Sequence, residues 1–333
     1  MLRTVLAFSL LLALGVAAPA AAEDVAVTFD DLPMLSLNDS TAYAQTTTTR
    51  LLAALKRSHV PTTGFVNEGK LERPDKLARI AMLSAWLDAG MDLGDHSYTH
   101  LSLTRTPVEA YIADVEKGET VTRALLAARG RTLHWYRHPY LETGPTLQAR
   151  KQFEDWLHAH GYMVAPVTME NSDWLFAMPY DFAVMRGDEA DAARIRQAYL
   201  EFTAQVVPWY RQAALDVLGR RPAMVMLLHA SRLNADSVVQ LARILRDNDL
   251  HPAALDQVMT DPAYEIEDTY AGPNGDQWIT RWGRALHKDL PWKTLPQPPV
   301  EIAAEDARID DDVAAALEAA AAAKDARTNA AAR

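Results

Sequence analysis

The 333-residue sequence contains no cysteine, which excludes disulfide bridges, thiolate metal sites and a cysteine nucleophile. It also lacks a Walker or other glycine-rich nucleotide loop, and this disfavours kinases and dehydrogenases. Basic residues are scarce, with 33 Lys and Arg against 44 Asp and Glu, so the formal net charge is −11. Such an acidic chain is a poor candidate for binding nucleic acid or anionic membranes.

Long apolar runs are missing as well. The apolar stretch from Thr4 to Val16 is too short to cross a bilayer. It follows Arg3 and precedes the small residues Ala20-Ala21-Ala22, a pattern typical of a secretory signal peptide. We therefore predict a signal peptide over residues 1–22 and an exported, periplasmic or secreted, protein with no stable membrane insertion after cleavage. An uncleaved membrane anchor is the alternative.

Short apolar segments alternate with longer amphipathic ones along most of the chain. The strand-like segments are Val25–Phe29, Thr62–Val66, Met91–Gly94, Thr132–Tyr136, Tyr162–Val167, Phe182–Met185, Met224–Leu228 and Pro252–Val258. The helix-like segments are Ala44–Arg57, Pro74–Ala89, Pro107–Arg129, Pro145–His160 and Ala190–Leu218, with a break expected at Pro208. This alternation predicts an α/β fold with a mostly parallel sheet, and about seven such units favour a barrel over an open sheet.

The composition divides the chain into further parts. Residues 23–260 hold the predicted barrel domain, with a helical insertion at about 175–222. Residues 261–300 are predicted to form an irregular extension rich in Trp and Pro. Residues 301–333 are rich in Ala, which indicates a helical or disordered tail. The sequence predicts no oligomeric state.

Two adjacent carboxylates, Asp30 and Asp31, end the first apolar run. Neighbouring side chains of a strand point to opposite faces, so both can serve one site only if the strand ends between them and the chain turns. The following Leu32-Pro33 favours such a turn. The alternative is a helix N-cap or an exposed pair of turn residues.

The segment GDHSYTH contains His96 and His100, four residues apart. On a helical turn this spacing places both rings on one face, where they can hold one metal ion. His134 and His138 have the same spacing but lie in a predicted strand, where four residues span ~13 Å. We therefore assign the metal site to the first pair and treat His134 as a packing residue.

Three further segments place polar residues after apolar runs. Arg137 follows one run and can hold a carboxylate in bidentate fashion, unless it is a surface residue before a turn. The segment ENSDW, Glu170 to Trp174, offers two carboxylates and an aromatic ring, and its alternative is a loop acid beside a core Trp. His229 ends a wholly apolar run, where a barrel places catalytic groups, although buried structural histidines also occur there.

In this order the segments resemble the five motifs of the polysaccharide deacetylase family, the NodB-homology or family 4 carbohydrate esterases. The matching residues are Thr28-Phe29-Asp30-Asp31, His96-Ser97-Tyr98-Thr99-His100, Arg137-His138-Pro139-Tyr140, Asp173-Trp174 and Leu227-Leu228-His229. The resemblance extends from about Val25 to Met259. It implies a distorted (β/α) barrel and a hydrolase that removes acetyl groups from a carbohydrate.

The resemblance also implies a role for each residue. One divalent ion, usually zinc and otherwise cobalt or another divalent metal, would be held by Asp31, His96 and His100. Asp30 would be the general base and His229 the general acid. The residues that would support the reaction or contact the substrate are Arg137 beside Asp30, Asp173 beside His229, the backbone N–H of Tyr140 for the oxyanion, Leu227 for the acetyl methyl group, and Trp174 and His138 along the groove.

Two departures from the family pattern concern the substrate more than the chemistry. Leu32 stands where the family usually has Gly, and Glu170 stands where it usually has Asp. We therefore predict a metal-dependent N- or O-deacetylase acting on a carbohydrate, with the N-acetyl amide favoured. The alternatives are a hydrolase of another small amide, such as a deformylase, and a non-catalytic carbohydrate-binding protein. The presence of both Asp30 and His229 argues against the last, since a binding protein needs neither base nor acid.

Overall fold

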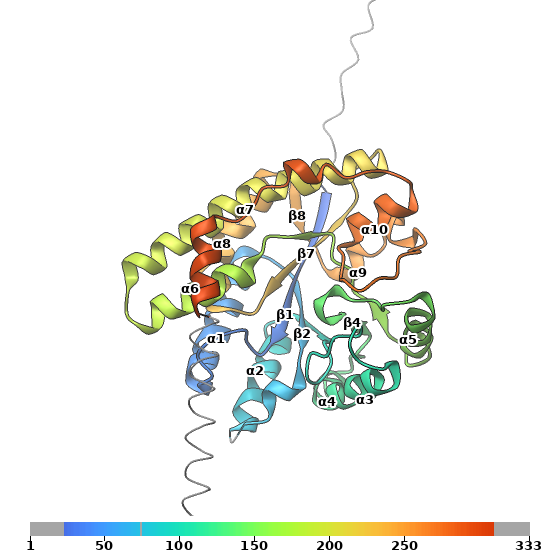
Figure 1. Cartoon of the computed structure of the whole chain (residues 1–333). Coiled ribbons are helices and arrows are strands. Elements are labelled where there is room, and N and C mark those ends of the chain that lie inside the picture. The colour runs from blue at the N-terminus through green and yellow to red at the C-terminus, as the bar shows by residue number, and fades with distance from the viewer. Residues whose placement is uncertain (1–22, 74, 310–333) are drawn as a thin grey trace, which may run out of the picture.

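The computed structural model describes residues 23–73 and 75–309, so the predicted signal peptide and the end of the Ala-rich tail lie outside the described residues. A parallel sheet of eight strands occupies the centre of the molecule, with helices around it (Figure 1). The strands are β1 (Glu23–Leu32), β2 (Thr62–Val66), β3 (Asp92–Asp95), β4 (Trp135–Tyr136), β5 (Met163–Val164), β6 (Met169–Glu170), β7 (Met224–His229) and β8 (Leu250–Pro252).

The strand order is β5-β4-β3-β2-β1-β7-β6, and β8 pairs with the beginning of β1. Every pairing is parallel. Among the described residues no pairing joins β5 to β6, so the curled sheet remains open on that side. The prediction of a distorted (β/α) barrel is confirmed.

Strand β1 lies inside the sheet, with β2 on one side and β7 on the other. Its residues are buried almost throughout, as expected of a parallel strand that is covered on both faces. Because all strands run in the same direction, their carboxyl ends meet at one edge of the sheet. In α/β barrels this edge carries the functional residues.

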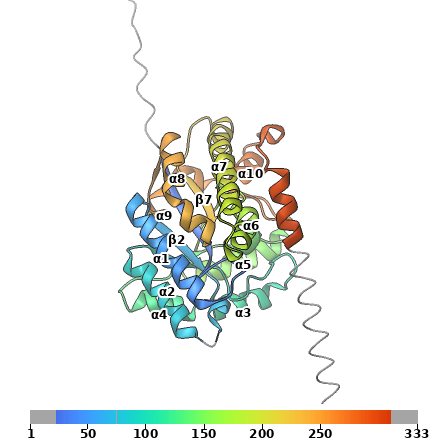
Figure 2. The same cartoon turned by 90° about the vertical axis from the view of Figure 1, so that its left-hand side faces the viewer.

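The helices cover the outside of the sheet. They are α1 (Thr41–Ser58), α2 (Lys76–Asp88), α3 (Val108–Gly118), α4 (Thr120–Ala127), α5 (Leu147–Ala159), α6 (Asp173–Met185), α7 (Glu189–Leu218), α8 (Arg232–Asp247), α9 (Leu255–Val258) and α10 (Trp278–Ala285). Helix α8 packs against α1, and α6 and α7 pack against each other and against α8 (Figure 2). Ser40, Thr146 and Ser231 begin α1, α5 and α8 by accepting hydrogen bonds from backbone N–H groups.

One strand prediction and one predicted helix break were wrong. The segment Phe182–Met185, predicted as a strand, is the last turn of α6, because a short apolar run fits a buried helix as well as a strand. The expected break at Pro208 is absent from α7. A proline inside a helix leaves one carbonyl group of the preceding turn without its backbone hydrogen bond. Because Pro208 is exposed, water can bind this carbonyl group instead.

Three other boundaries differ from the prediction. Residues 107–129 form two helices, because the Glu68 carboxylate accepts hydrogen bonds from the amides of Val121 and Thr122 and so caps a new helix, α4. Of the predicted strand at 252–258, only Pro252 belongs to a strand, β8, and 255–258 form α9; the two-residue strand β6 was not predicted.

The segment after the barrel crosses the sheet edge near β6. Within 261–300, predicted to be irregular, lie the 3-10 turns Pro262–Glu265 and Trp292–Thr294 and the helix α10, which packs on α7. Residues 300–309 are helical. The range 175–222, predicted as an insertion, holds most of α6 and all of α7; its origin as an insertion stays a prediction. None of the described helices has the length and apolar character that a membrane crossing requires.

Candidate active site

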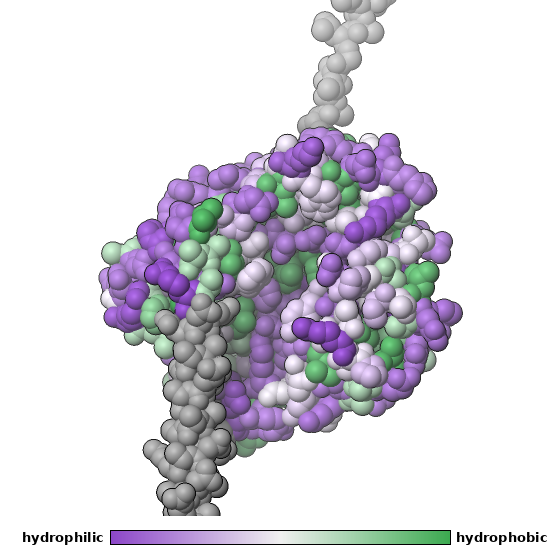
Figure 3. All heavy atoms as spheres, viewed as in Figure 1, coloured by the Kyte–Doolittle hydropathy of each residue, from purple (hydrophilic) through white to green (hydrophobic). Residues whose placement is uncertain are grey.

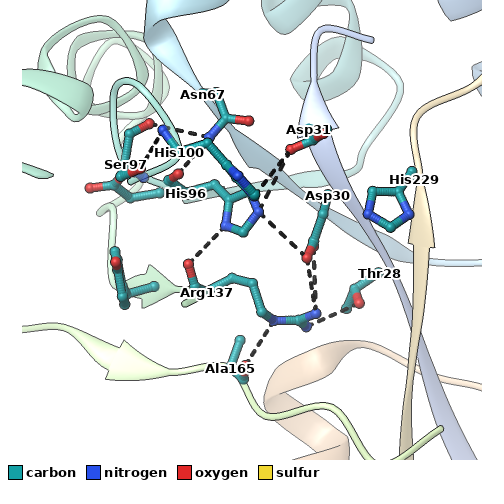
Figure 4. A network of polar contacts seen from close by, with 12 residues as sticks. Thr28, Asp30, Asp31, Asn67, His96, Ser97, His100, Arg137, Ala165 and His229 are labelled. Carbon is teal, nitrogen blue, oxygen red and sulfur yellow. Dashed lines mark hydrogen bonds and ion pairs between the residues drawn. The ribbon is translucent and has the colours of Figure 1, made fainter. Parts of the chain in front are cut away.

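Asp30 and Asp31 lie on β1 at a β-bulge. From Phe29 to Leu32 the strand advances three residues while its partner β2 advances two, from Gly64 to Val66. Asp31 is the left-handed residue of this bulge, with φ of 70°. The prediction that the strand ends between the two carboxylates is therefore wrong, because β1 continues to Leu32 and the bulge turns both side chains toward one site (Figure 4).

His96 and His100 come from the loop that follows β3, not from a helical turn as predicted. Ser97 and His100 have φ of 65° and 59°, and these left-handed residues fold the loop back on itself. The Asp95 carboxylate accepts a hydrogen bond from the Ser97 backbone N–H at 2.7 Å, and the Asn67 side-chain amide donates one to the His96 carbonyl oxygen at 2.5 Å. The two imidazole rings consequently lie with their centroids 4.8 Å apart.

The side chains of Asp31, His96 and His100 form a cluster that can hold a metal ion, with ligand atoms within 4.8 Å of one another. The Nε2 atoms of both histidines lie 3.7 Å from Asp31 Oδ1. This oxygen is buried and has no hydrogen-bond partner in the described part of the chain. A buried carboxylate oxygen facing two imidazole nitrogens is the donor set that a divalent ion such as zinc binds, so these residues fit a metal.

The protonation states of the cluster also suit a cation. Burial lowers the pKa of His96 to about 4, and burial together with the neighbouring His96 lowers the pKa of His100 to about 4. Both rings are therefore neutral at pH 7 and keep a free lone pair. Burial alone would raise the pKa of Asp31, yet the Lys70 ammonium, 3.1 Å from Oδ2, holds it well below its usual range.

Asp30 lies beside this cluster and pairs with Arg137 from the end of β4. The guanidinium NH1 is 3.4 Å from Asp30 Oδ2, and both side chains are buried. Arg137 is itself held by the Thr28 hydroxyl at 3.1 Å and the Ala165 carbonyl at 2.8 Å (Figure 4). Burial raises the pKa of Asp30 to about 6, although Arg137 opposes this shift. Asp30 is thus a carboxylate at neutral pH that can readily take up a proton.

His229 ends β7 directly beside Asp30, its register partner on β1. Its Nδ1 lies 2.8 Å from Asp173 Oδ1, and its backbone N–H donates to the other Asp173 oxygen at 2.6 Å. Asn234 donates to the same carboxylate at 2.5 Å. Burial opposes protonation of the ring, but the Asp173 carboxylate raises the pKa of His229 to about 9. His229 is therefore a protonated imidazole at neutral pH.

These groups share one cavity of about 520 Å³ at the carboxyl edge of the sheet. Figure 3 shows this face of the molecule hollowed near its middle. The lining residues are Asp30, Asp31, Leu35, His96, His100, His138, Tyr140, Leu141, Glu170, Trp174, Leu227, His229, Gly275 and Gln277.

All four residues predicted to contact the substrate line this cavity. Tyr140 and Trp174 are 53% and 47% exposed, so their rings are open to a ligand, whereas His138 and Leu227 are buried. The Tyr140 ring stacks edge-on against His100 with centroids 4.4 Å apart. His134, in contrast, lies outside the cavity and approaches Asp256 at 3.3 Å.

Some residues of the site were not found from the sequence. Lys70 follows the carboxyl end of β2, and a search for charged residues after every predicted strand would have found it. Gly275 and Gln277 reach the cavity from the segment after the barrel. No local pattern marks them, because their position depends on contacts with residues far away in the sequence.

Residues 17–156 match the family model described as polysaccharide deacetylase. The resemblance to the polysaccharide deacetylase family is confirmed. The matched segment includes Asp30, Asp31, His96, His100 and Arg137, whereas Asp173 and His229 follow it. No curated protein matches the chain.

Solved structures of polysaccharide deacetylases and related proteins resemble the chain distantly. A family 4 carbohydrate esterase from Streptomyces lividans is 19% identical, with 72% of this chain and 97% of that chain covered and a TM-score of 0.45. A polysaccharide deacetylase from Bacillus cereus is 20% identical, with coverage of 70% and 91% and a TM-score of 0.48. A family 4 pseudoenzyme from Bacillus anthracis is 15% identical, with coverage of 72% and 66% and a TM-score of 0.46. Identities this low do not indicate a substrate.

Proposed function

We propose that the protein is an exported, metal-dependent deacetylase that hydrolyses N-acetyl groups of a carbohydrate. The observation that carries this proposal is the convergence of a candidate metal site, a carboxylate and a protonated imidazole on one cavity. Asp30 and His229 lie side by side on paired strands, and their pKa values of about 6 and about 9 suit a base and an acid at neutral pH.

Asp31, His96 and His100 would hold the ion, with zinc the best match for a set of two imidazoles and one carboxylate. A divalent ion bound there would supply Lewis acidity toward the attacking water and the amide carbonyl group. The chain contributes the orientation of its donors. The carbonyl group of Arg137, 2.8 Å from His96 Nδ1, sets the direction of the His96 ring.

Asp30 is the group that takes the proton from the attacking water. Its carboxylate is held in place by Arg137, which also disfavours protonation before the reaction. The raised pKa makes it a stronger base than an exposed aspartate, since burial destabilises its charge. A general base of this kind contributes about 10²- to 10⁴-fold to the rate.

His229 is the group that protonates the departing amine. An amine is a poor leaving group without a proton, and the imidazolium carries one at neutral pH. Asp173 accepts the Nδ1–H and so directs the proton of Nε2 to the substrate side. The backbone N–H of Tyr140 would stabilise the oxyanion, and Leu227 would contact the acetyl methyl group.

An acetate-release assay tests this function. The purified mature protein is incubated with chitin oligomers, acetylated xylan or peptidoglycan fragments, with zinc or cobalt added. We expect release of acetate from an N-acetylated substrate, its loss on chelation, and its recovery when metal is restored. Absence of acetate with the metal-loaded protein on all three substrates would contradict the proposal, and release of formate from formylated amines would support the deformylase alternative.

A further inference from the structure

One wall of the cavity is polar and comes from two distant segments. Glu170, at the end of β6, accepts a hydrogen bond at 2.9 Å from the side-chain amide of Gln277, which precedes α10. Both residues line the cavity and both are partly buried. One Glu170 oxygen is used in this bond, so its second oxygen and the side-chain amide oxygen of Gln277, Oε1, remain as acceptors.

Gln277 is held in this position from both sides. The next residue, Trp278, donates its backbone N–H to the Val167 carbonyl at 2.6 Å. The preceding Asp276 carbonyl accepts a hydrogen bond from the Arg281 guanidinium at 3.1 Å.

Arg281 anchors the segment to the residues that follow Tyr140. It is 1% exposed and also binds Asp268 at 2.6 Å, Thr143 at 3.0 Å and the Leu141 carbonyl at 3.3 Å. The segment from Asp268 to Arg281 is therefore fixed to the turn beside Tyr140. Gln277 belongs to a rigid wall, and little conformational entropy would be lost when a ligand binds it.

The rest of the cavity offers apolar surface that complements this wall. Trp174, Leu35 and Leu141 are among its lining residues. A ligand that fits such a site has an apolar face and an edge of hydrogen-bond donors. A pyranose ring has both, and a cavity of about 520 Å³ has the size of a small-molecule site.

We propose that Glu170 and Gln277 form a subsite that binds a hydroxyl group of a sugar residue and selects saccharides over other acetylated compounds. This inference rests on the proposed function, because it concerns the same cavity. It assigns a substrate-contacting role to a residue that lies well outside the segment matching the family model, residues 17–156.

The test compares Gln277→Leu and Glu170→Gln with the wild-type protein. Binding of the N-acetylglucosamine tetramer to metal-free protein is measured by calorimetry, and hydrolysis of 4-nitrophenyl acetate, which carries no hydroxyl group, is measured with zinc. Gln152→Leu is the matched control, because Gln152 donates to Glu109 at 2.8 Å in an exposed pair of the same kind. We expect tetramer binding about tenfold weaker in both site variants, the effect of one hydrogen bond, with a smaller loss of ester hydrolysis and with both measurements unchanged in the control.

The subsite would be overturned if the tetramer did not bind to the wild-type protein, or if the wild type and both site variants bound it with equal affinity. Equal losses on the tetramer and on the ester would also overturn it, since these indicate a general distortion of the site. Failure of the proposed function has a different signature. The wild-type protein would then release no acetate from any substrate, while the calorimetric comparison would still report on the subsite.

Discussion

His96 donates its Nδ1–H to the backbone carbonyl oxygen of Arg137 across 2.8 Å. A carbonyl oxygen can only accept, so this bond places the proton of the neutral ring on Nδ1 and leaves the lone pair of Nε2 facing Asp31. The end of β4 thus orients a candidate ligand that follows β3. The same residue, Arg137, holds the candidate base Asp30 with its side chain.

Replacing His96 by alanine should weaken zinc binding by more than about 100-fold, because a ligand is lost that its surroundings had already oriented. Calorimetric titration of the metal-free protein with zinc measures this change. His134→Ala is the control, since His134 lies outside the cavity, and it should bind zinc as the wild type does. If both variants lose the same affinity, the assigned site is wrong.

Asp30→Asn should keep its zinc and lose turnover by about 10²- to 10⁴-fold, because the amide cannot take up a proton. Metal analysis and kcat on the best substrate measure the two effects separately. The matched control is Asp92→Asn. Asp92 also pairs with an arginine, Arg131 at 2.6 Å, but it begins β3 at the opposite edge of the sheet. A turnover rate of Asp30→Asn equal to that of this control would show that another group is the base.

Asp173→Asn should move the alkaline limb of the pH–rate profile to lower pH. The wild-type His229, with its pKa raised to about 9, stays protonated below that value and loses its proton as the pH rises through it. Without the Asp173 charge the pKa of His229 falls toward the ordinary value of 6.5. The alkaline limb should therefore move down by about one pH unit or more. Rates are measured at saturating zinc at each pH, and an unchanged limb would argue against His229 as the acid.

Gly275→Ala should lower both stability and turnover. A Cβ atom at this position would overlap the carbonyl oxygen of Tyr140, and backbone cannot move aside as a side chain can. We expect a loss of about 1–3 kcal/mol in the free energy of unfolding, typical of overpacking, and a lower kcat from displacement of the Tyr140 turn. Thermal unfolding and steady-state kinetics measure the two effects.

Gly272→Ala provides the comparison. Its Cβ would meet the hydroxyl end of the Tyr270 side chain, which can rotate away. This variant should unfold and turn over much like the wild type. Equal effects of the two substitutions would mean that the contact with the Tyr140 turn has no particular role in the reaction.

The chemistry of the site was largely predictable from the sequence. Apolar runs that end in polar residues placed Asp30, Asp31, Arg137 and His229 at the carboxyl edge of a parallel sheet, because strand direction and burial are local properties. The comparison of two histidine pairs with equal spacing selected the pair whose rings both line the cavity beside Asp31, although it assumed a helical turn where the structure has a loop.

What the sequence by itself determined is therefore the alternation of strands and helices and the kinds of groups at the strand ends. Only the tertiary structure decided how they meet: the bulge that brings Asp30 and Asp31 to one site, the left-handed loop residues that join His96 to His100, and the delivery of Gln277 across the sheet edge. The physical reason is that periodicity and propensity act over a few neighbouring residues. Loop conformation and the approach of a distant segment depend instead on hydrogen bonds between residues far apart in the chain, such as those of Arg281 to Leu141 and Thr143.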